Sequence, residues 1–421
     1  MATGVVRNIR KQVFHSLQNV LVRNQPRDQQ LHQILSDCED SPQSRGFVTE
    51  LFYGSLQYFH YFDSVRLAVL GKKKWPLPLK ILTCMSLYQL HRMDGVPDYA
   101  AVNESLKLLP HKFKGLKGAL NFLLRESGRN KSVLDVDGFV PDWYKTRLES
   151  VFEGDETRRL EQLLLEKPWT FFSHPEASSL GGIASYTPVC GDIFCTESLT
   201  RVQNQEIENS GGLVCDLYSL ILPGWIQKHQ GVHLDLCSSP GGKFLRAGHA
   251  GLGTEIRAVE INTARFSRLQ ERVNYHSLSQ EVSMHNADAL EYLDGLEEGS
   301  IDSVYLDPPC SAVGTIPAHP EYLLTKEKQD LLENVDLQKR LIKAAARVLK
   351  PSGQMIYSTC SFLPEEGELH DFQSCDLKEE LVSCSSEAIL IRKASQGYYC
   401  LPTKPGGQYF YSILLRKGFG K

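Results

Sequence analysis

Two cysteines are the residues of this chain best placed to carry out covalent chemistry. Cys310 follows an apolar, strand-like segment and the residues Asp-Pro-Pro, and Cys360 follows a second such segment that ends in Tyr-Ser-Thr. A single cysteine is more often a small buried apolar residue than a nucleophile. Two cysteines at neighbouring strand ends, each beside backbone-restricting residues, instead indicate a pair of reactive thiols. A helix predicted to begin at Pro364 would favour the thiolate form of Cys360.

A glycine-rich turn precedes both cysteines. The segment VHLDLCSSPGGK begins at Val232 as an apolar run, reaches Asp235 and passes through Gly-Gly into a predicted helix. A strand, a tight turn and a helix start in this order allow backbone N–H groups to approach a ligand closely. The residues expected to contact this ligand are Cys237, Ser238, Ser239, Pro240, Gly241, Gly242 and Lys243.

Carboxylates mark the ends of the next predicted strands. Glu260 comes close to the offset of about 20 residues at which an acid receives ribose hydroxyls, and Asp288 and Asp307 follow later strands. Acids around one rim suit a neutral or cationic nucleoside better than a polyphosphate. No phosphate-binding Gly-Lys-Ser/Thr motif is present, because Phe follows Gly-Gly-Lys. The sequence therefore predicts S-adenosylmethionine as the cofactor.

Strand and helix patterns alternate through residues 211–421. Apolar segments predict strands at 232–236, 256–260, 281–284, 302–306 and 353–358, and helical spacing predicts helices near 241–249, 263–278 and 326–348. This alternation is typical of a doubly wound, Rossmann-like α/β domain with a mostly parallel sheet. Tyr409–Leu415, after a Pro-Gly-Gly turn, is expected to be an antiparallel edge strand. Ligands of such sheets bind beyond the carboxyl ends of the strands, where all of these motifs lie.

Residues 1–130 have a helical pattern and a basic charge. Five segments with few strand signals predict an all-α domain, and the stretch 44–70 predicts one long helix. These 130 residues contain 18 Lys and Arg against 10 Asp and Glu, whereas the remainder contains 28 against 40. The basic balance suggests that this domain meets a polyanion. The first 23 residues resemble a transit peptide in lacking acids, but apolar residues spaced as on one helix face favour the first helix of a bundle.

Several classes of protein are disfavoured by composition. The longest apolar runs fall short of the ~18 residues of a membrane span. Eleven cysteines without regular spacing suggest free thiols in a reducing compartment, the cytoplasm. Cys190 and Cys195 have no second ligand pair nearby, so no metal site is expected.

The front helices carry segments similar to a known RNA-binding module. RGFVTELFYGSLQYFHYFD, ILTCMSLYQL, VPDYAAVNESLKLL and GALNFLLRE resemble, over about residues 5–126, the NusB-like domain of the bacterial ribosomal RNA small-subunit methyltransferase B family. Residues 131–210 are then expected to form a linker and a small α/β subdomain similar to an RNA-recognition module. The stretch WTFFS, from Trp169, stands where this family usually has Leu-Arg-Val-Asn.

Three motifs of the second half support the same resemblance. DLCSSPGGK, DPPCSAVGT followed by HPE, and YSTCSFLPEEGE together resemble RNA 5-methylcytosine methyltransferases. The resemblance implies methylation of cytosine C5 in RNA, with 16S ribosomal RNA as the expected substrate. It implies that Cys360 attacks C6 of the base and that Cys310 assists product release. Asp307, if it lies near N3 of the base, would stabilise charge that spreads through the ring. His319, Lys243 and Ser361 are further possible contacts.

Other functions stay open at this stage. Transfer RNA is an alternative substrate, and an RNA-binding assembly factor without catalytic activity would also carry these domains. The same fold methylates exocyclic amines when an aromatic residue follows Asp/Asn-Pro-Pro, but Cys310 occupies that position. Small departures from the family pattern are Ser238-Ser239 for Ala-Ala, Ala312-Val313 for a Gly-containing pair, and Glu260 for Asp.

Overall fold

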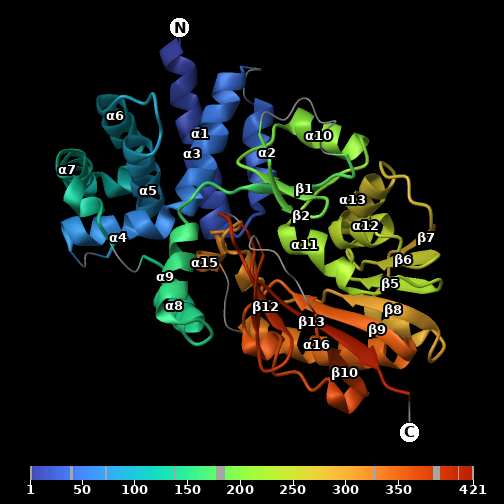
Figure 1. Ribbon diagram of the computed structural model, residues 1–421. Coiled ribbons are helices and arrows are strands. Elements are labelled where there is room, and N and C mark those ends of the chain that lie inside the picture. Colours follow the sequence, from blue (N-terminus) through green and yellow to red (C-terminus); the bar gives the residue numbers. More distant parts are fainter. Residues whose placement is uncertain are drawn as a thin grey trace. The chain divides into compact units, whose positions relative to one another are not determined.

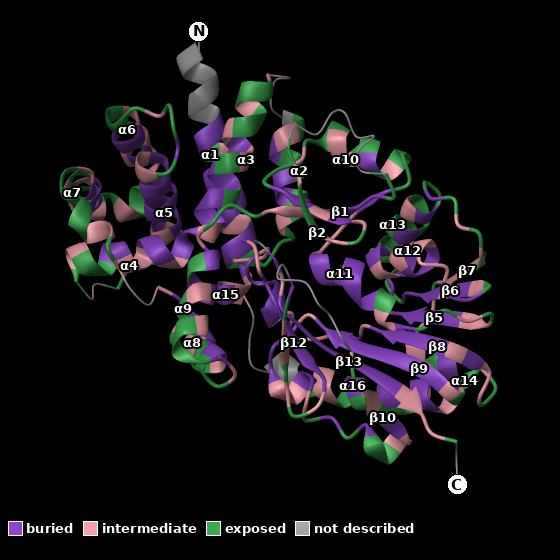
Figure 2. Cartoon of the chain, viewed as in Figure 1, coloured by how far each residue is buried: buried purple, intermediate pink, exposed green. Residues whose placement is uncertain are grey.

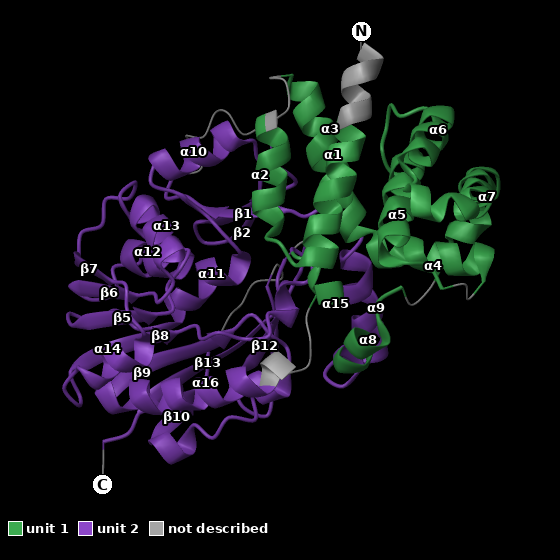
Figure 3. Cartoon of the chain, turned by 180° about the vertical axis from the view of Figure 1, so that it is seen from behind, with its two compact units in different colours: residues 1–147, 319–325 green, residues 148–318, 326–421 purple. Residues whose placement is uncertain are grey.

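The protein divides into two compact units. The computed structural model describes residues 2–37, 41–71, 74–136, 139–176, 185–325, 329–382, 389–405 and 407–419. The first unit comprises residues 1–147 and 319–325, and the second comprises residues 148–318 and 326–421 (Figure 3). The predicted domain boundaries near residues 130 and 210 stay predictions.

All regular elements in the described part of the first unit are helical. They are α1 (Ala2–Arg23), α2 (Arg27–Asp37), α3 (Pro42–Gln57), α4 (Phe59–Leu70), α5 (Leu77–His91), α6 (Asp98–Leu108), α7 (Lys117–Arg129), α15 (Tyr322–Thr325) and the short 3₁₀ helices His111–Leu116 and Lys131–Leu134; α8 (Asp142–Glu149) crosses the boundary between the units. Helix α5 is the centre of this unit, because its residues from Leu79 to Gln89 are buried except Lys80 (Figure 2). It packs closely on α3, where a Cβ added to Gly54 would meet the Tyr88 ring at 1.9 Å. The predicted all-α domain is confirmed.

Two details of the helical prediction were wrong. The stretch expected as one long helix is divided at Tyr58, which ends α3 and precedes α4. Helix α2 was not expected, because its sequence is mostly polar and only Gln30, Leu31 and Ile34 are buried among its described side chains. These few buried residues hold α2 in place, and they are too few to produce the periodic pattern of apolar residues that predicts a helix.

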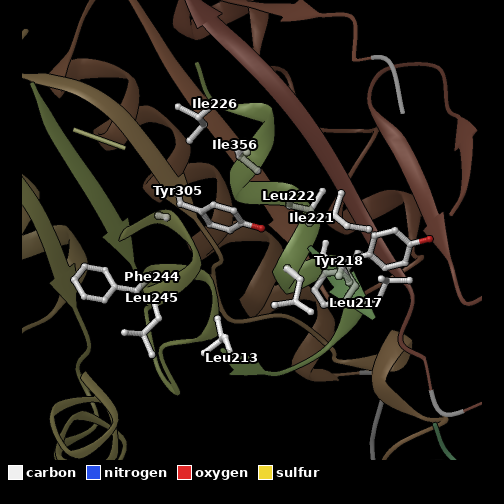
Figure 4. Close-up of a cluster of buried hydrophobic side chains, with 14 of the residues drawn as sticks. Leu213, Leu217, Tyr218, Ile221, Leu222, Ile226, Phe244, Leu245, Tyr305 and Ile356 are labelled. Carbon is white, nitrogen blue, oxygen red and sulfur yellow. The ribbon is translucent and has the colours of Figure 1, made fainter. Parts of the chain in front are cut away.

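A small antiparallel sheet opens the second unit. Its strands β1 (Thr170–Ser173), β2 (Thr187–Cys190), β3 (Ile193–Thr196) and β4 (Leu213–Val214) lie in the order β2-β3-β1-β4, and the nearby helices are α9 (Gly154–Leu163), α10 (Arg201–Asn209) and α11 (Leu217–Ile221). One apolar core joins this sheet to the larger one, because Leu213 and Leu217 share a cluster with Phe244 (Figure 4). WTFFS supplies β1, and Phe171 and Phe172 are buried.

The larger sheet has nine strands among the described residues (Figure 1). The order is β11-β12-β13-β9-β8-β5-β6-β7, with β10 also paired to β13. Strands β5 to β9 are parallel to one another, and β13 is antiparallel to β9. The elements are β5 (Val232–Leu236), α12 (Gly242–His249), β6 (Glu255–Val259), α13 (Thr263–Val273), β7 (Glu281–His285), α14 (Ala289–Asp294), β8 (Ile301–Leu306), α16 (Gln329–Val348), β9 (Leu349–Thr359), β10 (Leu377–Glu380), β11 (Leu390–Lys393), β12 (Tyr398–Leu401) and β13 (Phe410–Lys417). The predicted doubly wound α/β fold is confirmed.

The position of the last strand corrects the prediction. Strand β13 was expected at the sheet edge, yet it lies between β9 and β12, and its residues from Phe410 to Leu415 are buried. The short strands β10 and β11 are polar or partly exposed, so they carry no strong strand signal.

The chain reverses direction across the sheet between β5 and β8. From β5 the chain proceeds through β6 to β7, then crosses back to β8 and β9. Open α/β sheets bind ligands beyond the strand ends at such a reversal. The loops after β5, β8 and β9 therefore form the region where a ligand is expected to bind. No helix in the described part of the chain is long and apolar enough to cross a membrane.

Candidate active site

The loops after β8 and β9 bring the two predicted cysteines together. The sulfur atoms of Cys310 and Cys360 are 3.1 Å apart, and both residues are partly buried. The strands are parallel neighbours with Leu306 opposite Tyr357, so their carboxyl ends lie side by side. Two thiols from positions 50 residues apart in the sequence thus share one location.

A glycine fixes the Cys310 loop against the Cys360 loop. The Gly314 N–H donates to the Cys360 carbonyl at 3.0 Å, and the Tyr409 N–H donates to the Gly314 carbonyl at 2.9 Å. A Cβ on Gly314 would lie 2.3 Å from the Tyr409 carbonyl oxygen and 2.8 Å from that of Cys360. Both contacts are with backbone, which cannot easily move, so only glycine fits here.

The environment of Cys310 favours a protonated thiol. Contact with the Cys360 sulfur, burial, and the negative charges of Glu366 and Asp307 together raise the pKa of Cys310. The helix predicted from Pro364, which was expected to favour a thiolate at Cys360, is only a three-residue 3₁₀ turn ending at Glu366. The predicted helix was wrong, because the chain leaves this turn and forms a second short 3₁₀ turn, Gln373–Cys375, before β10.

A partly buried ion pair lies near the thiols. The Lys243 ammonium donates to the Asp307 carboxylate, and it lies 5.1 Å from the centre of the Phe410 ring. Burial alone would lower the pKa of Lys243, but Asp307 and other groups, including Cys360, more than offset this effect and raise it. Lys243 is therefore a charged lysine whose ammonium interacts with both Asp307 and Cys360. Sequence reasoning placed it only among the cofactor contacts.

The glycine-rich turn has the backbone conformation that its sequence predicted. Cys237 and Gly241 both have positive φ angles, 61° and 94°, and α12 begins at Gly242. The Gly241 N–H donates to the Ser238 carbonyl at 2.8 Å, which closes the turn. A Cβ on Gly241 would meet Leu269 at 2.6 Å. Ser239 and Pro240 lie within the same turn, so residues other than glycine also determine its backbone conformation.

Asp235 and Glu260 lie beside this turn and have different environments. Asp235 is 1 % exposed; one carboxylate oxygen accepts from the Ser238 hydroxyl at 2.9 Å, and the other has no partner among the described residues. Glu260 accepts from the Asn262 N–H at 2.8 Å and more weakly from the Ser239 N–H at 3.4 Å. A buried acceptor without a donor fits a ligand that brings hydroxyl or ammonium groups.

Three other predicted contacts have local structural duties. Asp288 caps α14, accepting from the N–H groups of Leu290 at 2.8 Å and Glu291 at 3.2 Å. The Ser361 hydroxyl accepts from the Leu363 N–H at 3.1 Å. His319 lies in the first unit, where its ring stacks on Tyr322. In the part of the chain that the structure describes, no three His, Cys, Asp or Glu residues gather as metal ligands.

The protonation of Asp235 gives a testable pH dependence. Burial is the main cause that raises the pKa of Asp235 to about 7, whereas an unfolded chain releases this proton near pH ~4. Between these values the folded protein binds more protons than the unfolded chain, so stability falls as the pH rises through this window. We therefore expect the change in the free energy of unfolding caused by Asp235→Asn to be more stabilising at pH 8 than at pH 4, by about 1–3 kcal/mol.

Urea unfolding of the ligand-free protein at both pH values measures this difference. The substitution keeps an oxygen for Ser238 and changes no volume, which makes the charge the main variable. An equal effect at both pH values, or a larger loss of stability at pH 8 than at pH 4, would show that Asp235 is ionised in the folded protein.

Comparisons with known proteins place this site in a family. Residues 226–416 match the family described as 16S rRNA methyltransferase RsmB/F, and residues 7–118 match the NusB family. The ribosomal RNA small subunit methyltransferase B of Pasteurella multocida is 34 % identical over 396 residues, which cover 84 % of each chain. The protein of the same name from Proteus mirabilis is 25 % identical over 413 residues, covering 90 % of this chain and 91 % of its own.

A solved structure has the same fold along nearly the whole chain. The crystal structure of PH0851 superposes with a TM-score of 0.67 and 17 % identity, covering 97 % of this chain and 99 % of that chain. At this identity the likeness shows the fold alone. The sequence match to the Pasteurella protein, by its length and identity, shows the family as well as the fold. Together with the paired thiols at the strand ends, it shows that this chain belongs to the RsmB/F family of 16S rRNA methyltransferases.

Proposed function

We propose that this protein methylates C5 of a cytosine in 16S ribosomal RNA, with S-adenosylmethionine as the methyl donor. The observation that supports this most is the 3.1 Å contact between the sulfurs of Cys310 and Cys360 at the ligand-binding edge of the sheet. C5 methylation needs a nucleophile that adds to the base and a group that helps to remove it again. Methylation of an exocyclic amine needs neither thiol.

The groups around the glycine-rich turn fit the donor. The unpartnered oxygen of Asp235 and the nearby carboxylate of Glu260 are acceptors for ammonium and ribose hydroxyl groups. The turn that contains Cys237 and Gly241, both with positive φ, directly follows β5, at the strand end where such sheets bind nucleosides. When bound there, S-adenosylmethionine supplies an electrophilic methyl group.

Cys360 is the proposed nucleophile. Its thiolate forms a bond to C6 of cytosine, and the electron pair of the C5–C6 double bond moves to C5, which becomes strong enough to take a methyl group. The charge of the Lys243 ammonium interacts with this sulfur. Asp307 is held by the same ammonium and stands at the strand end beside the thiols, where it can contact the ring of the base.

Cys310 is the proposed assistant in the release step. The C5–H bond breaks and its proton passes to water, the C5–C6 double bond re-forms, and the electron pair of the C6–S bond returns to Cys360. A sulfur that leaves as an anion leaves more readily when a proton donor is close. Cys310, whose raised pKa keeps it protonated, is a donor 3.1 Å from that sulfur.

The front domain offers a surface for the RNA. From Ser105 to Arg125 the chain contains no acid, and its five cations are all exposed: Lys107, Lys112, Lys114, Lys117 and Arg125. Phe122 lies within this stretch on α7 and is 55 % exposed. Exposed cations with an aromatic ring between them suit phosphates and unstacked bases. The target cytosine must itself leave its stack, because C5 and C6 are not accessible to a thiol within a helix.

Bisulfite sequencing of RNA tests the substrate. We expect one or more 5-methylcytosines of 16S ribosomal RNA to disappear in cells that lack the protein and to return when the gene is restored. The Cys360→Ala gene is not expected to restore them. Loss of a methylated cytosine in transfer RNA with 16S unchanged would identify the other substrate. Unchanged methylation of both RNAs, with a defect in ribosome assembly, would show a non-catalytic assembly factor.

A further inference from the structure

A fully buried carboxylate lies directly behind the loop that carries Cys310. Glu366 has no exposed surface. One of its oxygens accepts from the Ser311 N–H at 2.7 Å, and the other accepts from the Ser311 hydroxyl at 2.5 Å. Both oxygens are thus bound to the residue that follows Cys310.

The residue before Cys310 is held from the same side. The Gln338 side-chain amide, from α16, donates to the Pro309 carbonyl at 2.9 Å, and it lies 3.4 Å from the Glu366 carboxylate. Gln338 is itself fully buried. The peptide units on both sides of Cys310 are therefore hydrogen-bonded to one buried polar pair.

Glu366 is in turn tied to the strand that ends at Cys360. Its backbone carbonyl accepts from the Tyr357 hydroxyl at 2.8 Å and from the Thr359 hydroxyl at 3.3 Å. Tyr357 and Thr359 both lie on β9, and Thr359 directly precedes Cys360. One residue thus connects the loop of the first thiol to the strand of the second.

Stability alone does not account for this arrangement. A carboxylate taken out of water costs free energy unless a cation or enough hydrogen bonds compensate. Among the described residues, no lysine or arginine forms an ion pair with Glu366. An apolar side chain of similar size would fill the space without that cost, but it would leave the Ser311 N–H without its acceptor.

We propose that Glu366 is a positioning residue, which holds the Cys310 sulfur against the Cys360 sulfur so that the second thiol can act in release. This inference rests on the proposed function for its purpose, but the geometry it claims does not depend on RNA or cofactor. Sequence reasoning missed this role, because Glu366 was taken only as part of a helix start. The signal available was a pair of acids, Glu365-Glu366, so soon after a candidate catalytic cysteine.

Chemical cross-linking of the two thiols measures the geometry directly. Diamide takes up the two electrons and two protons that the thiols lose as the S–S bond forms. The rate of the 310–360 cross-link is followed by peptide mapping of the folded protein, without RNA or cofactor. We expect the cross-linking rate to be about ten-fold lower in Glu366→Ala, because a displacement of about 1 Å is enough to separate reacting atoms. In Glu366→Gln we expect the rate to fall by a smaller factor.

Glu368→Gln is the matched control. It removes the same charge two residues away, but Glu368 accepts from Ser395 and Tyr399 rather than from the catalytic loop. Its cross-linking rate is expected to equal that of the parent. Ser311→Ala, which removes only the hydroxyl contact, should slow the cross-link by a smaller factor and serves if Glu366→Ala does not fold. Rates within two-fold of the parent in folded Glu366→Gln and Ser311→Ala would overturn the inference.

Single-turnover methylation separates this inference from the proposed function. In Glu366→Ala we expect the covalent protein–RNA adduct to form at close to the parent rate and to decay about ten-fold more slowly, and in Glu366→Gln we expect a smaller slowing of the decay. Slow cross-linking in the Glu366 variants of a protein that methylates no RNA would remove the proposed function and keep the positioning role. Normal adduct decay together with normal cross-linking would remove the positioning role and keep the proposed function.

Discussion

Cys360→Ala is expected to lower methyl transfer to 16S ribosomal RNA at least about a thousand-fold, since removal of a catalytic nucleophile eliminates the covalent route. The side chain is only partly buried, so the loss of one sulfur is expected to leave the fold in place. Cofactor binding should stay within a few-fold of the parent, because the glycine-rich turn and Asp235 belong to a different loop. Incorporation of labelled methyl groups and equilibrium dialysis of S-adenosylmethionine measure the two effects.

Cys375→Ala provides the control for the first prediction. Cys375 is a partly buried thiol in a 3₁₀ turn before β10, away from the strand ends that form the site. Its replacement is expected to leave both measurements unchanged. Substantial methyl transfer by Cys360→Ala would show that this sulfur is not the nucleophile.

Cys310→Ala is expected to trap the enzyme on its substrate. Attack by Cys360 needs no group from Cys310, but release loses the proton donor that lies 3.1 Å from the departing sulfur. A covalent protein–RNA complex should therefore accumulate in the presence of S-adenosylmethionine and appear as a slow band on a denaturing gel. Multiple turnover should fall by about two to four orders of magnitude, the range typical of a lost acid–base group.

The double variant Cys310→Ala, Cys360→Ala tests the origin of that band. Without a nucleophile no adduct can form, so the band should be absent. If Cys310→Ala alone turns over at the parent rate and gives no band, Cys310 has a structural role. In that case release depends on another group, and the contact between the two sulfurs is a consequence of packing.

Most of the catalytic edge follows from local patterns. The apolar segments that end at Leu236, Leu306 and Thr359 are true strands, because most of their side chains are buried in the sheet. The Gly-Gly turn is equally local, since its positive φ angle is easiest for glycine. Parallel strands joined by helices have their carboxyl ends at one edge, so the meeting of loops distant in sequence was also predictable.

Other features depend on contacts that no local pattern encodes. The edge strands β10 and β11 have weak sequence signals and exist because β13 and β12 provide hydrogen-bond partners. Helix α2 is mostly polar and depends on a few buried residues. His319, a possible contact from the motif that follows the Cys310 loop, is grouped by the fold with the helices of the first unit.

The amino-acid sequence by itself determined the order of strands and helices and the position of the glycine-rich turn. It also determined which two thiols and which acids lie at strand ends. Spacing and residue type are enough for this, because backbone conformation at glycine and proline and the burial of apolar segments act over a few residues. Only the tertiary structure decided that Lys243 pairs with Asp307 and that Glu366 holds the loop of Cys310. These interactions join side chains whose partners are far away in sequence or hidden by burial, and a hydrogen bond or ion pair is set by the distance between atoms in space.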